Sequence, residues 1–421
     1  MYKVYFKQAL LMLRQNKFIS LIAIMGTALA IMMIMTIIVT DEIKEISTAP
    51  EINRYRTLYI NYQVKRDTAR NSWQSGSIPY ETLKEYLYPL KTPLHVSGVN
   101  PSWSNIPNTL ITREGSSEII NAHMRITDTA YWKIMSFSFL QGRPFSDGEF
   151  QSGISVAVVS ETLARQVFKG ENALGQTFLV NFKPYRIVGI VEDVSPVFKQ
   201  AYGDLWIPNT TQPVENRFTE VMLMAESLED FPAIIEEVRK MEKKFETEHS
   251  PWILYLKGPV NNKIFQKEVY GNNAEEIASA IAVQKRKMIF ILLILLLIPA
   301  INLSGLSLSR IKKRTEEIGI RKAFGAKKYT ILIQVLFENL ITSVIGGVIG
   351  LALSYVVVFQ MRDWLLDIAA DSTIPASTLI SFPVLLAVFA VCLIINLLSA
   401  GIPAYRASRM KIINSLNQND K

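Results

Sequence analysis

Four long apolar blocks constrain the fold of this chain more than any other feature. They are residues 18–39, 288–308, about 331–359 and about 381–402. A helix needs roughly 20 mostly apolar residues, at about 1.5 Å per residue, to cross the hydrocarbon layer of a bilayer. Each block is long enough. The sequence therefore predicts an α-helical membrane protein with four transmembrane helices, one before and three after a large domain at 40–287.

The first block has two other interpretations. A buried helix of a soluble protein would keep a polar face at helical spacing, and the run FISLIAIMGTALAIMMIMTIIV has none. A cleaved signal peptide is the second alternative, because basic residues precede the block. Signal peptide cores hold about 7 to 15 apolar residues and end in a small-x-small site. This block is longer and lacks such a site, so we interpret it as an uncleaved anchor.

Basic residues are distributed unevenly between the segments that flank the blocks. Residues 1–17 hold four basic and no acidic residues, residues 309–330 hold eight against two, and residues 403–421 hold four against one. Residues 360–380 hold one basic residue against three acidic ones. Basic residues favour the cytoplasmic side. We therefore expect a multi-pass protein of the cytoplasmic (inner) membrane, with both termini and the 309–330 loop in the cytoplasm and residues 40–287 outside it.

The charge of the large domain differs from that of the whole chain. Residues 40–287 hold 28 basic and 30 acidic residues, whereas the whole chain has a net charge of +8. The positive charge thus belongs to the membrane-flanking segments, which indicates topology and contact with anionic lipid rather than nucleic-acid binding. The single cysteine, Cys392, lies in the fourth block. The large domain must therefore be stable without disulfides.

The large domain alternates strand and helix patterns. A strand, helix and strand order occurs at 56–64, 79–90 and 94–99, and again at 218–226, 228–248 and 252–258. It predicts an α+β domain of two β-α-β units, at about 50–104 and 213–260, around an inserted β-rich subdomain at 105–212. Residues 261–287 read as a polar helical stalk. Residues 1–17 predict an amphipathic helix on the inner membrane surface, with an ordinary polar lead-in as the alternative.

Motifs for catalysis or metal binding are not evident in the sequence. The run from Gly325 to Thr330 lacks the glycine spacing of a phosphate-binding loop. The three histidines, His95, His123 and His249, are far apart, and no serine lies in a Gly-x-Ser-x-Gly motif. We therefore expect a non-catalytic membrane subunit that binds no cofactor or metal itself. If ATP drives the protein, hydrolysis takes place in a partner chain.

Two features inside the apolar blocks indicate packing against other parts of the protein. Small residues at helical spacing allow close helix approach, as at Gly346, Gly347 and Gly350 and more weakly at Gly26 and Ala30. The alternative is that small residues are simply common in membrane helices. Glu338 is the acidic residue within the apolar blocks, and we expect it to face protein or the cytoplasmic surface, because an isolated carboxylate in lipid is costly.

The loop between the second and third blocks contains the run RTEEIGIRKAFGA, residues 314–326. It predicts a short helix along the membrane surface, with Glu316 and Glu317 at its positive end and Gly325 as its terminator. Ile320 and Phe324 lie four residues apart and form an apolar knob that can enter a groove on a soluble partner. A loop that only satisfies the positive-inside rule is the alternative, yet that rule does not require the glutamates or the Ile-Gly-Ile and Phe-Gly-Ala runs.

These residues resemble the FtsX-like permeases of ABC transporters, the superfamily that contains the macrolide exporter MacB and the lipoprotein-release permeases. The matching runs there are 317–326, Gln334 with Glu338, 346–350 and 403–408. The middle of the chain resembles the MacB-like periplasmic core domain, at 139–145, 158–164, 174–176 and 188–191. The resemblance covers nearly the whole chain, and the order of one helix before the domain and three after it strengthens it.

The resemblance implies a mechanism and partners. The helix at 315–326 would couple to a cytoplasmic ABC ATPase that binds ATP and Mg. Movement of this ATPase would drive movement of the external domain. The coupling residues would be Glu316, Glu317, Ile318, Gly319, Ile320, Arg321, Lys322, Phe324, Gly325 and Ala326. A second permease chain, identical or a paralogue, is expected, with a periplasmic adaptor or outer-membrane channel as further candidates. The cargo would be a drug, peptide or lipoprotein. The alternative is a signalling regulator that activates an external partner such as a cell-wall hydrolase.

Overall fold

The computed structural model describes most of the chain outside the C-terminal region. The described residues are 6–7, 11, 13–15, 17–43, 47–101, 106–113, 115–213, 218–267, 269, 274–313, 315–325, 327–361, 365, 386, 389–390, 393–394, 397, 401 and 405. Contacts divide the chain into two compact units. The helical unit comprises Met1–Glu42, Val283–Leu366 and Pro375–Lys421, and the α/β unit comprises Ile43–Ala282 and Asp367–Ile374.

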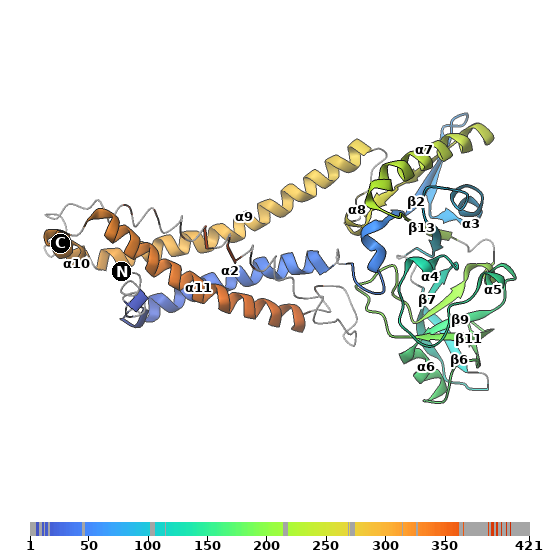
Figure 1. The fold of residues 1–421 in the computed structure, drawn as a ribbon, viewed down its shortest axis with the longest axis horizontal. Helices are drawn as coiled ribbons and strands as arrows, with labels where there is room; N and C mark the ends of the chain where they lie inside the picture. Colours follow the sequence, from blue (N-terminus) through green and yellow to red (C-terminus); the bar gives the residue numbers. More distant parts are fainter. Residues whose placement is uncertain are drawn as a thin grey trace. The chain divides into compact units, whose positions relative to one another are not determined.

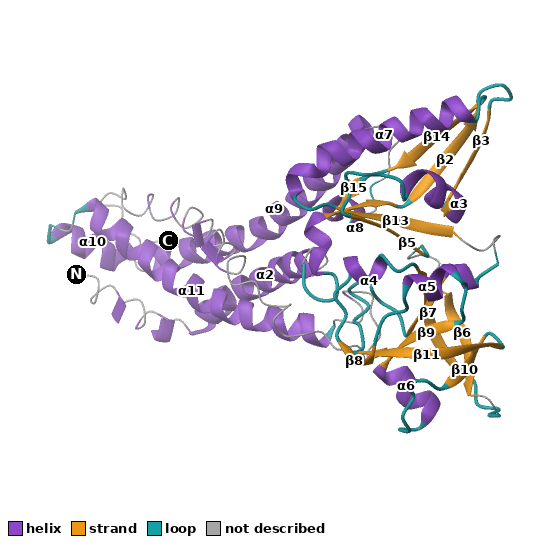
Figure 2. Ribbon diagram, turned by 45° about the vertical axis from the view of Figure 1, so that its right-hand side comes forward, coloured by secondary structure: helices purple, strands orange, loops and turns teal. Residues whose placement is uncertain are grey.

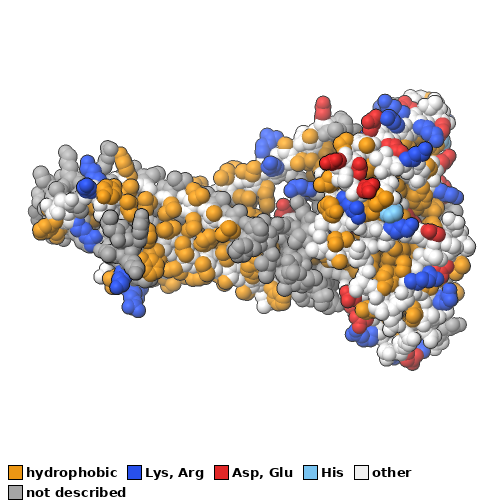
Figure 3. All heavy atoms as spheres, in the orientation of Figure 1, with side chains coloured by type: hydrophobic (Ala, Val, Ile, Leu, Met, Phe, Trp, Pro, Cys, Tyr) orange, Lys and Arg blue, Asp and Glu red, His pale blue; other side chains and the backbone are white. Residues whose placement is uncertain are grey.

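Long helices build the helical unit (Figure 1). Among the described residues, two helices are long and apolar enough to cross a membrane, Lys17–Asp41 within α2 (Lys17–Ile43) and α11 (Lys328–Gln360). The second apolar block lies inside α9 (Ala274–Lys313), which runs unbroken for 40 residues. Hydrophobic side chains cover much of the visible surface of these helices (Figure 3). The fourth predicted block and the predicted surface helix at 1–17 lie mostly outside the described residues, so the count of four transmembrane helices stays a prediction.

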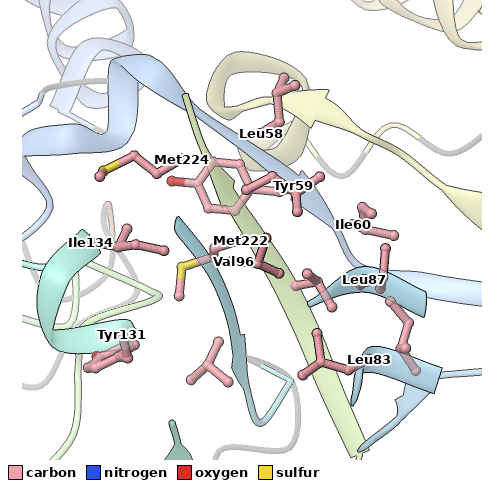
Figure 4. Packing of buried hydrophobic residues seen from close by; sticks show 14 of the residues in the cluster. Leu58, Tyr59, Ile60, Leu83, Leu87, Val96, Tyr131, Ile134, Met222 and Met224 are labelled. Atoms are coloured by element: carbon pink, nitrogen blue, oxygen red, sulfur yellow. The ribbon is translucent and has the colours of Figure 1, made fainter. Parts of the chain in front are cut away.

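One part of the α/β unit is an antiparallel sheet covered by helices (Figure 2). Its strands pair in the order β5, β13, β1 and β15, and β4 also pairs with β13. Their bounds are β1 (Thr57–Ile60), β4 (Ile78–Pro79), β5 (His95–Val99), β13 (Phe218–Met224) and β15 (Val260–Asn261). The helices are α3 (Tyr80–Thr82), the π-helical turn η2 (Leu83–Leu87), α7 (Phe231–Glu248) and α8 (Asn262–Gln266). Figure 4 shows Leu83 and Leu87 packing toward Ile60 and Met222 in the core of this part.

The strand predicted at 56–64 is divided between two sheets. It consists of β1 and of β2 (Tyr62–Asp67), with Asn61 between them. All four residues of β1 are buried, whereas β2 has buried, half-buried and exposed residues and pairs with β14 (Trp252–Lys257) and β3 (Ser72–Gly76). A change of burial pattern at Asn61 therefore marks where the chain leaves the larger sheet.

The segment between the two predicted β-α-β units closes on itself. β12 pairs with both β9 and β7, so β7, β6, β10, β11, β9 and β12 form a ring of paired strands around a second hydrophobic core. The bounds are β6 (Ile106–Arg113), β7 (Ile120–Thr127), β9 (Val156–Ser160), β10 (Thr177–Val180), β11 (Lys183–Val191) and β12 (Leu205–Pro208). β8 (Phe139–Gly142) and the helices α4 (Tyr131–Ile134), α5 (Asp147–Gln151) and α6 (Glu161–Phe168) complete this part.

Buried polar side chains join the ring to the helix-covered sheet. Asp128 accepts hydrogen bonds from Tyr88 Oη at 2.6 Å, Ser97 Oγ at 2.7 Å and the Gly98 amide at 2.7 Å. Arg125 is fully buried and donates to the carbonyls of Tyr202 at 2.7 Å, Asn100 at 3.1 Å and Lys199. These bonds satisfy the buried carboxylate and guanidinium, which would otherwise be costly.

Glu149, in the first turn of α5, is expected to make the α/β unit acid-sensitive. Hydrogen bonds from Arg143, at 2.8 and 3.0 Å, lower the pKa of Glu149 to about 2 from an ordinary 4.5. A lowered folded pKa stabilises the fold fully above pH 4.5, and this contribution is lost as the pH falls towards 2. Since Arg143 is largely exposed, we expect a contribution of about 1 kcal/mol near neutral pH.

The measurement for Glu149 is hydrogen exchange of the α5 amides as a function of pH. Glu149→Gln should reduce their protection near neutral pH, and the difference from wild type should shrink as the pH falls towards 2. Glu171→Gln is the control, because that carboxylate is mostly exposed and pairs with Arg113 at the surface. A difference between wild type and Glu149→Gln that does not change with pH would contradict the ion-pair explanation.

Candidate functional site

The loop after α9 contains a short helix, α10 (Thr315–Ala323). Its end follows from Gly325, which has φ +89°, a left-handed conformation that glycine adopts without strain. The Phe324 amide still donates to the Ile320 carbonyl at 3.0 Å. Of the residues predicted for this site, Ala326 and the side chains of Glu316, Glu317 and Lys322 lie outside the described part of the chain.

One face of α10 packs against neighbouring helices. Ile318 is buried in an apolar cluster with Ile311 of α9 and with Ile331 and Val335 of α11. Gly319 is also buried. Buried aliphatic side chains each contribute about 1.5 to 3 kcal/mol. The cluster therefore ties α10 to both helices that flank the loop.

The other face of α10 leaves two large apolar side chains exposed. Phe324 is 88% exposed and Ile320 is 50% exposed. They are spaced four residues apart and so lie on the same side of the helical turn. An aromatic side chain this exposed beside a well-anchored helix is typical of a contact for another protein.

A polar connection joins α10 to the interior of α11. Arg321 Nη1 donates to Gln334 Oε1 at 2.8 Å, and Gln334 Nε2 donates to Glu338 Oε1 at 3.4 Å. Gln334 and Glu338 are both buried. The predicted intramembrane acid Glu338 thus faces protein, one helical turn beyond a residue that contacts the loop helix. A displacement of α10 would act on α11 through this connection as well as through Ile318.

The predicted packing glycines lie against α2. A Cβ atom added at Gly346 would lie 2.9 Å from the Ile24 carbonyl oxygen and from Thr27 Cβ. A Cβ added at Gly350 would lie 2.5 Å from the Ala28 carbonyl oxygen and 3.0 Å from Ile31 Cβ. Real Cβ contacts are longer, so the absence of side chains is what allows this approach.

The other predicted packing residues lie nearby with different neighbours. A Cβ added at Gly347 would meet the Phe389 ring, and Ile31 Cδ1 at 3.4 Å. Ala30 is buried and Gly26 is half-buried. The α2 residues that meet the α11 glycines are therefore Ile24, Thr27, Ala28 and Ile31, which lie beside the predicted pair Gly26 and Ala30. Thr27 lies three residues after Ile24 and four residues before Ile31, so the three share one face of the helix. This spacing is the sequence pattern that could have predicted the contact face of α2.

Comparison with protein families gives matches to two sequence models, which together span most of the chain. The sequence model of the MacB-like periplasmic core domain matches residues 20–241, and that of the FtsX-like permease C-terminal region matches residues 289–412. The first match alone covers more than half of the chain. The protein belongs to the MacB/FtsX-like family of ABC transporter permeases.

Similar proteins include both short and long relatives. The uncharacterized ABC transporter permease YknZ of Bacillus subtilis (strain 168) is 25% identical over 297 residues, 68% of this chain and 67% of YknZ. The macrolide export ATP-binding/permease protein MacB 1 of Yersinia pestis bv. Antiqua (strain Antiqua) is 23% identical over 423 residues, 98% of this chain and 60% of that protein. The alignment with MacB of Bdellovibrio bacteriovorus spans 42% of that relative.

Two solved structures resemble part of the chain. The extracellular domain of the noncanonic ABC-type transporter YknZ from Gram-positive bacteria is 15% identical, with a TM-score of 0.36, and the match covers 47% of this chain and 99% of that domain. The periplasmic region of MacB from Actinobacillus actinomycetemcomitans is 14% identical, with a TM-score of 0.35, over 50% of this chain and 92% of that structure.

Proposed function

We propose that this chain is the membrane subunit of an ABC complex that works by mechanotransmission. ATP hydrolysis in a separate cytoplasmic ATPase, which binds ATP and Mg, would move α10, and the membrane helices would carry this movement to the domain outside the cytoplasm. The task would be export or efflux of a drug, peptide or lipoprotein-like cargo. The names of the relatives support this proposal, since they include macrolide export and ATP-binding/permease proteins.

The exposed pair Ile320 and Phe324 is the observation that carries the proposal. These side chains offer an apolar contact to a soluble partner, while Ile318 and Arg321 hold the same helix to α9 and α11. A partner that pulls on Phe324 would therefore pull on two long helices together. A second permease chain, identical or a paralogue, would provide the matching half of the complex, and a periplasmic adaptor or outer-membrane channel would extend it.

Copurification in mild detergent from native membranes tests the proposal. Tagged wild-type protein should retain a soluble ABC ATPase, identified by mass spectrometry. Phe324→Asp should reduce its recovery by about tenfold or more, because a charge replaces an apolar anchor at the contact. Phe182→Asp is the matched control, since Phe182 is an aromatic side chain of the α/β unit that is 74% exposed.

Three results would count against the coupling role of α10. ATPase recovery that is equal for wild type and Phe324→Asp would place the contact elsewhere. Loss of recovery with Phe182→Asp as well would indicate a general effect of the substitution. If neither protein retains an ATPase and both retain a protein from outside the cytoplasm, the signalling regulator becomes the better explanation.

A further inference from the structure

The α/β unit contains a cavity of about 590 Å³ that has no part in the coupling site. Its walls come from α7, α8, the turn before β15 and the first turns of α9, which lie side by side in Figures 1 and 2. The volume falls within the range of about 300 to 1,000 Å³ that is usual for small-molecule sites. The lining is mainly apolar, with Phe231, Ile235, Ile264, Ile277 and Ile281 as its large side chains.

One wall of this cavity carries a partly buried ion pair. Arg239 Nη1 lies 2.6 and 2.8 Å from the two carboxylate oxygens of Glu242, and Nη2 donates to the Gly258 carbonyl at 2.8 Å. The Leu256 amide donates to Glu242 Oε1 at 2.6 Å. Burial raises the pKa of Glu242, against the opposing effect of Arg239. The pair thus provides the charged groups of a mainly apolar site.

The Arg239 side chain lines the cavity and is only partly covered by its neighbours. Arg239 and Glu242 both line the cavity, and the Arg239 side chain is 37% exposed whereas that of Glu242 is 10% exposed. The guanidinium also lies over the Tyr255 ring, 5.3 Å from its centroid, which fixes its position. An oxygen of a ligand would therefore meet the cation of this pair before the carboxylate, and accept a charge-assisted hydrogen bond.

We propose that this cavity binds an amphiphile with a single acyl chain, the chain lying among the apolar side chains of α7, α8 and α9 and a carbonyl or carboxylate oxygen meeting Arg239. The site is a property of the α/β unit and goes beyond the proposed ATPase coupling. Ile277, Ala278 and Ile281 line one side of the cavity and belong to α9. An occupant would therefore contact the beginning of the helix that continues into the second apolar block.

Photolabelling of the full-length protein in native membranes tests this site. The probe is a fatty acid with a diazirine in its chain, and labelled peptides are identified by mass spectrometry. We expect labelling of peptides from α7 and from the first turns of α9. Ala278→Phe should reduce it by about tenfold or more, because a benzyl side chain occupies the space of the acyl chain.

Ser279→Phe is the matched control for Ala278→Phe. Ser279 is the next residue of α9, is exposed and does not line the cavity, so the same benzyl group there should leave labelling unchanged. Competition with unlabelled dodecanoate and with an N-lauroyl peptide distinguishes a free fatty acid from an acylated peptide as the occupant. Equal labelling of both variants, or no label in α7 and α9 of wild type, would overturn the proposal. Neither result depends on ATPase binding.

Discussion

Replacing Gly350 by leucine is expected to separate α11 from α2 and to destabilise the helical unit by about 3 kcal/mol or more. A Cβ at this position would lie 2.5 Å from the Ala28 carbonyl oxygen, and a backbone atom in a helix cannot move aside alone. Gly347→Leu should have a smaller effect, because its obstacle is the Phe389 side chain, which can change rotamer.

The control for Gly350→Leu is Gly305→Leu in α9, where an added Cβ would meet nothing within 4 Å. The measurement is the midpoint of thermal unfolding in detergent, with the monodisperse fraction after size-exclusion chromatography. Gly350→Leu should lower both, and Gly305→Leu neither. A wild-type unfolding midpoint and monodisperse fraction for Gly350→Leu would contradict the close contact between α2 and α11.

Arg125→Met should destabilise the α/β unit by about 3 to 5 kcal/mol. The substitution keeps most of the side-chain volume but leaves the carbonyls of Asn100, Lys199 and Tyr202 without their donor in a buried region. For a domain of this size the cost corresponds to a fall of about 10 °C in the unfolding midpoint. The midpoint can be followed by tryptophan fluorescence, because Trp206 is fully buried in this unit.

Arg113→Met is the comparison for Arg125→Met. Arg113 is 37% exposed and pairs with Glu171, which is 62% exposed, so its loss should cost less than about 1 kcal/mol. Similar shifts for the two variants would mean that the buried bonds of Arg125 contribute no more than a surface pair. That outcome would contradict its role in joining the ring to Asn100, which follows β5, and to the segment at 199–202.

Local patterns in the sequence were sufficient for the helices and for much of the loop site. The apolar runs 18–39 and 331–359 lie inside α2 and α11, because membrane helices depend on composition along one segment. The spacing of Ile320 and Phe324 likewise needs only the helical period. The orientation of the chain and the fourth helix stay predictions.

Contacts between distant segments could not be predicted in the same way. The closure of the ring depends on Leu205 pairing with both Met124 and Val159, and alternation within a strand does not reveal its partner. The bond from Arg321 to Gln334 joins residues on either side of a loop. The pair of Arg239 and Glu242 lines a cavity that distant segments of the chain form, which the sequence does not reveal. The prediction of one strand at 56–64 was wrong for the same reason. On either side of Asn61 the chain pairs with different strands, β13 before it and β14 after it.

The closed ring has a mechanical consequence for the α/β unit. Every strand of the ring is held by hydrogen bonds on both sides, so a load on one strand is shared with the others and the ring should resist shear. Its sheet connection to β5 is a single residue pair, Val99 with Thr127. Under repeated loading, strain should therefore concentrate at this junction, and the stiffness of the whole unit should depend on the side chains that brace it, Asp128 and Arg125.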